Sequence, residues 1–80
     1  MAEMNFAEKQ NWAGLTPFQK ELVKAIRNMG FRHARNDVYV HETMNHIKVK
    51  SLDRWDHALK LFYTLGSEEK VYELKRFLNM

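Results

Sequence analysis

Residues 36–50, NDVYVHETMNHIKVK, alternate between apolar and polar side chains, and this alternation restricts the fold more than any other feature of the chain. A period of two is typical of a strand with one buried face, whereas the flanking segments show helical spacing. If residues 42–45 form a four-residue loop, the two halves pair as an antiparallel hairpin. The apolar face of that hairpin then contains two cross-strand pairs, Val40 with Ile47 and Val38 with Val49.

The polar side chains of the hairpin are expected on its other face. The same register makes three cross-strand pairs there: His41 with His46, Tyr39 with Lys48, and Asp37 with Lys50. Residues 31–35 can form a preceding strand, which would place Arg32 beside His41 on the polar face. The sequence therefore predicts a three-stranded antiparallel meander with one polar face.

Helical signals precede the meander. Thr16 is a typical N-cap residue, with Pro17 at the first helical position and Gln19 completing a capping box. Gly30 provides a helix stop. Between these signals the apolar residues recur with helical spacing, namely Phe18, Leu22, Ala25, Ile26 and Met29.

Two more helices are predicted after the meander, over residues 52–65 and 68–78. The element order is therefore α-β-β-β-α-α, an α+β fold with the helices on one face of the sheet and the other face uncovered. Residues 16–80 form a single compact domain in this prediction, and residues 1–15 form an N-terminal arm or a short helix. Docking of that segment is favoured, because so short a chain gains stability from additional burial.

Positive charge is concentrated in the middle of the chain. The 80 residues have a formal net charge of +3, and residues 20–60 contain nine Lys or Arg against five acidic residues, together with all four histidines. A local cationic excess is compatible with a polyanionic partner. The chain has no cysteine, no pattern of a secretion signal and no apolar segment of membrane-spanning length, so we expect no disulfide, no membrane association and a cytoplasmic location.

The uncovered face is the leading candidate for a binding surface. Its predicted members are Arg32, Tyr39, His41, His46, Lys48 and Lys50, with Lys20, Lys24 and Arg27 on the polar side of the first helix as additional candidates. The cations could hold phosphates while Tyr39 stacks on a base. Two other interpretations stay open: an ordinary solvated sheet face, or a surface for a protein partner.

The histidine pair on this face raises the question of catalysis. His41 and His46 could act as acid and base in cleaving RNA, but neither a nucleophile nor a third metal ligand follows at useful spacing. The element order is similar to that of double-stranded-RNA-binding domains and of HicA-type interferase toxins. The toxins have a catalytic histidine on a strand, and His41 of VYVHE is the residue that would correspond to it. The Lys-rich helix start of the RNA-binding domains is replaced by SLDRWDHALK, and the Gly-Ser-His setting of the toxins is absent. We therefore expect no enzyme, no metal and no cofactor, with an RNase toxin as a distant alternative.

Together these features predict a small binding or regulatory module whose first candidate partner is nucleic acid. The alternative is a protein inhibitor or adaptor, of the kind found among accessory proteins of phages and mobile elements, that uses the same face and the N-terminal arm with Phe6 and Trp12. Tyr72 and Phe77 lie off the apolar stripe of the last helix and would suit a homodimer.

Overall fold

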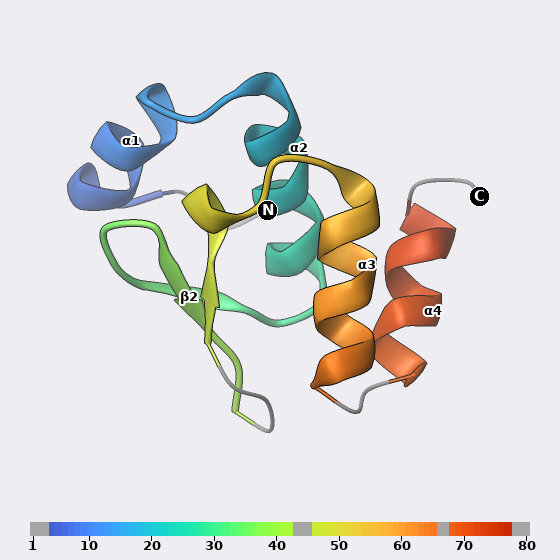
Figure 1. The fold of residues 1–80 in the computed structure, drawn as a ribbon. Helices are drawn as coiled ribbons and strands as arrows, with labels where there is room; N and C mark the ends of the chain where they lie inside the picture. Colours follow the sequence, from blue (N-terminus) through green and yellow to red (C-terminus); the bar gives the residue numbers. More distant parts are fainter. Residues whose placement is uncertain (1–3, 43–45, 66–67, 78–80) are drawn as a thin grey trace.

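The computed structural model describes residues 4–42, 46–65 and 68–77. Over these residues the chain forms α-helices and a three-stranded antiparallel sheet of strand order β1-β2-β3 (Figure 1). In chain order the elements are α1 (Phe6–Ala13), α2 (Pro17–Asn28), β1 (Arg32–Arg35), β2 (Val38–Val40), β3 (Ile47–Lys48), the 3₁₀ turn η1 (Val49–Ser51), α3 (Trp55–Thr64) and α4 (Glu68–Phe77). The predicted α+β class and the order α-β-β-β-α-α are confirmed, with α1 preceding them.

Local sequence signals explain where α2 begins and ends. Thr16 Oγ1 accepts the backbone N–H of Gln19 (3.1 Å), and Gln19 Oε1 accepts that of Thr16 (3.0 Å), so the predicted capping box is present. The Gln19 amide also donates to the carbonyl oxygen of Leu52 (3.0 Å), which ties α2 to the segment before α3. At the other end Gly30 adopts φ +101°, a conformation that glycine tolerates, and the chain turns there towards β1.

The core lies between the sheet and helices α2, α3 and α4 (Figure 1). Leu22, Ile26, Phe62 and Leu74 are fully buried. Phe31, just before β1, meets Phe62 edge-on with ring centroids 6.0 Å apart, which joins the sheet side of the core to α3. The helices thus cover one face of the sheet, as the period-two pattern predicts.

The hairpin pairs one residue away from the predicted register. Tyr39 lies opposite Ile47, and Val38 lies opposite Lys48. A shift of one residue turns the side chains of a strand to the other face. Tyr39 is accordingly 1% exposed and Val40 is 40% exposed. The predicted burial of Val40 and the predicted position of Tyr39 on the uncovered face are both wrong.

Two further details of the predicted meander are also wrong. Arg32 pairs with β2 at Val40, not at His41, and Val49 belongs to the turn η1 rather than to β3. Asp37 holds this turn, because its carbonyl oxygen accepts the N–H of Val49 (3.0 Å) and its carboxylate accepts the backbone N–H of Lys50 (2.9 Å). The Asp37 carboxylate therefore contacts the backbone of Lys50, and the two side chains do not form the predicted cross-strand pair.

Helix α1 lies beside β1 (Figure 1). Asn5 caps it by accepting the backbone N–H of Glu8 (2.8 Å). Met4 and Trp12 pack against the core, whereas Phe6 is 76% exposed. Within the described ranges no helix has the length and apolarity needed to span a membrane.

Candidate functional site

The sheet has one face packed against the helices and one face that no described helix covers (Figure 1). The pairing register places five residues on the uncovered side: Arg32, Arg35, Val38, Val40 and Lys48. These residues form what we call the outer sheet face. Four of them are exposed, and Val38 is 6% exposed because its cross-strand neighbours are Arg35 and Lys48, whose aliphatic stems can cover it.

The three cations of the outer sheet face lack acidic partners within the described ranges. The side chains of Arg32, Arg35 and Lys48 make neither an ion pair nor a hydrogen bond with any described residue. Neighbouring strands lie about 4.8 Å apart, so the backbones of β1 and β3, which flank β2, are roughly 10 Å apart. The outer sheet face is therefore a small cationic surface with exposed Val40 among the charges.

Tyr39 does not belong to this surface. It is the only Phe, Tyr or Trp in the three strands, and its hydroxyl donates to Glu8 Oε2 (2.5 Å) on the inner side of the sheet. Burial, the hydrogen bond to Glu8 and the negative charge of Glu8 raise the pKa of Tyr39 well above its ordinary value, while the charge of Arg27 acts in the opposite direction. Tyr39 is thus a buried hydrogen-bond donor and cannot stack on a base from the outer sheet face.

His41 and His46 do not form the predicted cross-strand pair. His41 Nε2 donates to the carbonyl oxygen of Met29 at the end of α2 (3.2 Å), and its ring centroid lies 5.0 Å from that of Phe31. His46 is exposed immediately before β3, where alternation places it on the side of Lys48. The two imidazoles therefore point to different faces, and His46 extends the outer sheet face.

The predicted cations of α2 contact side chains of α1 or α2. The contacts are Lys20 Nζ above the Trp12 ring (5.9 Å to the centroid), Lys24 with Glu21 (3.2 Å), and Arg27 Nε with Glu8 Oε2 (3.8 Å). Two of these contacts hold α1 against α2. Lys50 is exposed in η1, next to the outer sheet face but not part of its strands.

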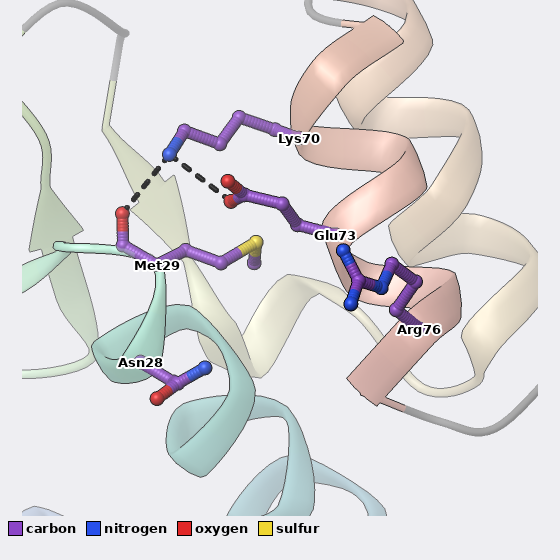
Figure 2. A pocket seen from close by; sticks show the side chains of 5 residues that line it. All are labelled: Asn28, Met29, Lys70, Glu73 and Arg76. Carbon is purple, nitrogen blue, oxygen red and sulfur yellow. Dashed lines mark hydrogen bonds and ion pairs between the residues drawn. The ribbon is translucent and has the colours of Figure 1, made fainter.

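A hollow lies between the end of α2 and helix α4 (Figure 2), and five residues line it: Asn28, Met29, Lys70, Glu73 and Arg76. Lys70 crosses the hollow and donates from Nζ to the carbonyl oxygen of Met29 and to Glu73 Oε2, each at 3.2 Å (Figure 2). The ammonium group thereby stands at the negative end of the α2 dipole. The hollow is thus bridged by Lys70, which joins the end of α2 to Glu73 of α4.

The start of α3 holds a second polar cluster. His57 Nδ1 donates to Asp53 Oδ1 (2.7 Å), while His57 Nε2 accepts from Arg54 Nε (3.4 Å). All three residues are exposed and within four positions of one another, so the cluster is a local surface contact at the helix start. In the part of the chain that the structure describes, no group of three or more His, Asp or Glu residues is placed to hold a metal ion.

Sequence reasoning missed Arg35 as a member of the candidate surface. The pairing of β1 with β2 contains an irregularity between His33 and Arg35, after which Asn36 turns the chain with φ +46°. This bulge returns Arg35 to the same face as Arg32. Comparison of the chain with protein-family models, with curated proteins and with solved structures gave no significant match.

Proposed function

We propose that the protein binds nucleic acid through the phosphodiester backbone, and that the outer sheet face makes the contact. The observation that carries the proposal is the presence of Arg32, Arg35 and Lys48, exposed and without acidic partners among the described residues, on a face that no described helix covers. Guanidinium and ammonium groups are the usual protein partners of phosphate, and arginine can bind it through two parallel hydrogen bonds.

Backbone contact is favoured over base recognition on this surface. The strand residue that could stack on a base, Tyr39, faces the interior. Cations that hold phosphates determine position and affinity but do not select a sequence. Binding should therefore tolerate many sequences and weaken steeply with salt, with a slope of log K against log salt of about −2.7 for three phosphate contacts on duplex DNA.

The test is a fluorescence titration of labelled nucleic acid at several salt concentrations. The triple variant Arg32→Gln, Arg35→Gln, Lys48→Gln should bind weakly, with a salt slope reduced by about 0.9 for each lost contact. A matched control is the triple variant Lys9→Gln, Lys60→Gln, Arg76→Gln, which removes the same charge from exposed residues outside the sheet. It should retain nearly the wild-type slope. Equal losses in the two triple variants, or no binding by the wild type at low salt, would refute the proposal.

A protein partner is the second candidate, and one observation favours it. Phe6 is 76% exposed on α1 and Tyr72 is 66% exposed on α4, and large exposed apolar side chains are frequent in protein interfaces. An inhibitor or adaptor function would use these residues, and Tyr72 would suit a homodimer through α4. Pull-down from lysate with and without nuclease treatment separates the two candidates: a partner that is retained after nuclease and lost with Phe6→Ser supports the protein interface.

A further inference from the structure

A buried polar network joins α1, α2 and β2. Glu8 of α1 is 5% exposed, although it is an acidic residue. Its Oε2 atom accepts the hydroxyl of Tyr39 (2.5 Å) and lies 3.8 Å from Nε of Arg27. A neutral donor and a guanidinium from two different elements thus converge on one carboxylate oxygen, an arrangement that would bind any oxyanion of similar size.

The rest of the α1 interface is weakly apolar. Glu8 is the only buried residue of this eight-residue helix, and Trp12 is half-buried. Asn11, one turn after Glu8, has a buried Nδ2 atom that finds no hydrogen-bond partner among the described residues. A buried donor without a partner costs about 1 to 3 kcal/mol, and a helix this short is not stable on its own in water. The docked state of α1 therefore depends on the network around Glu8.

We propose that Tyr39 and Arg27 form an oxyanion-binding site that Glu8 occupies in cis, and that α1 is a releasable strap over it. An external carboxylate or phosphate competes with Glu8 for the same two donors. When such an anion binds, α1 leaves, and the surface formerly covered by Glu8 and Trp12 becomes accessible. The site is separate from the outer sheet face, because Tyr39 points to the opposite side of the sheet.

Chemistry supports this assignment independently of the helix. A tyrosine hydroxyl is protonated at neutral pH, so Tyr39 remains a hydrogen-bond donor whether or not Glu8 is present. Arg27 supplies guanidinium N–H groups, which donate to carboxylate and phosphate oxygens alike.

The first experiment uses Glu8→Ala, which removes the internal carboxylate. Sodium phosphate and sodium acetate are titrated separately against this variant, with sodium chloride at matched ionic strength as reference, and the midpoint of thermal unfolding is followed. We expect a saturable rise of the midpoint, since a ligand that binds only the folded state stabilises it. A response to phosphate alone indicates phosphorylated ligands, and a response to acetate alone indicates acidic peptides.

The double variant Glu8→Ala, Tyr39→Phe is the control and should need at least about tenfold more anion for the same rise of the midpoint. No response in Glu8→Ala, or the same response in the double variant, overturns the proposal.

A second measurement, made on the wild type, tests whether an external anion competes with Glu8 even if Glu8→Ala does not fold. Amide hydrogen exchange of α1 should accelerate as phosphate or acetate is added, while exchange in α3 stays unchanged. Exchange in α1 that is insensitive to both anions would contradict competition with Glu8. The triple variant of the outer sheet face should keep this anion response, so the result is distinguishable from failure of the proposed nucleic-acid binding.

Discussion

At the scale of single residues, the hydroxyl of Tyr39 makes the stability of the protein depend on pH in the alkaline range. The pKa of Tyr39 is raised in the folded state above the value of 10.0 of an ordinary tyrosine, chiefly by burial and then by Glu8. The folded state therefore holds this proton more tightly than the unfolded state, and the contribution to stability is complete below about pH 10 and is lost as the pH rises beyond it. We expect the free energy of unfolding to fall with rising pH above about 10, as measured by urea denaturation.

The matched variant for this prediction is Tyr39→Phe. It should lower stability by about 1 to 3 kcal/mol at neutral pH, because Glu8 stays buried without its donor. Its stability should also decline less above pH 10 than that of the wild type, since the shifted group is gone. Parallel pH profiles for wild type and variant would show that Tyr39 is not the group responsible.

At the scale of elements, the hairpin register determines which apolar residues matter. Ile47 is 1% exposed and faces the helices, whereas Val40 is 40% exposed on the outer sheet face. Replacing Ile47 by Ala should cost about 2 to 4 kcal/mol, because it leaves a cavity in a thin core. Val40→Ala should cost well under 1 kcal/mol. Denaturation midpoints of the two variants measure the difference directly, and a larger loss for Val40→Ala would support the register expected from the sequence.

The elements themselves could be predicted from local signals, and the register could not. Thr16, Pro17 and Gln19 determine the start of α2 through contacts within four residues, so their pattern is readable in the sequence. Tyr39 was expected on the solvent side because a four-residue loop at residues 42–45 pairs Val40 with Ile47 and thereby puts the valines on the buried face. In the structure Tyr39 is buried, and its hydroxyl has a partner there. That partner is Glu8, which is 31 positions away in a helix whose docking no local pattern reveals. The burial of Tyr39 thus accompanies the docking of α1, a contact between segments far apart in the sequence.

The candidate site also contains residues that local patterns predict and residues that they do not. Arg32 and Lys48 were predicted on the uncovered face and lie there, since each is charged, exposed and placed by a strand. Arg35 was missed because a bulge changes the alternation after His33, and bulges have no simple sequence signature at a position without glycine. His41 was misplaced by the same one-residue shift of the hairpin that turned Tyr39 inwards. Its contact with the carbonyl oxygen of Met29 forms only when α2 and the sheet pack together.

At the scale of the whole molecule, the fold is expected to open unevenly. The core of α2, α3 and α4 contains the fully buried residues Leu22, Phe62 and Leu74, so the amides of these helices should exchange only when the protein unfolds globally. Helix α1 is held by the polar network of Glu8 and by half-buried Trp12. Its opening exposes little apolar surface and removes the cost of the unpaired Asn11 amide. Local opening of α1 should therefore require less free energy than global unfolding.

Hydrogen exchange measured by NMR tests this expectation residue by residue. Hydrogen-bonded amides of α1 should show protection factors at least about tenfold below those of α2, which corresponds to a difference of about 1.4 kcal/mol in opening free energy. Glu8→Gln should lower protection in α1 further while leaving α2 nearly unchanged, because it weakens only the contact between the helix and the network. Phe6→Ala, at an exposed position of the same helix, is the control and should leave the ratio of the protection factors of α1 and α2 unchanged. If α1 and α2 instead exchange with equal protection and respond together to Glu8→Gln, α1 is an integral part of one cooperative unit and cannot act as a releasable strap.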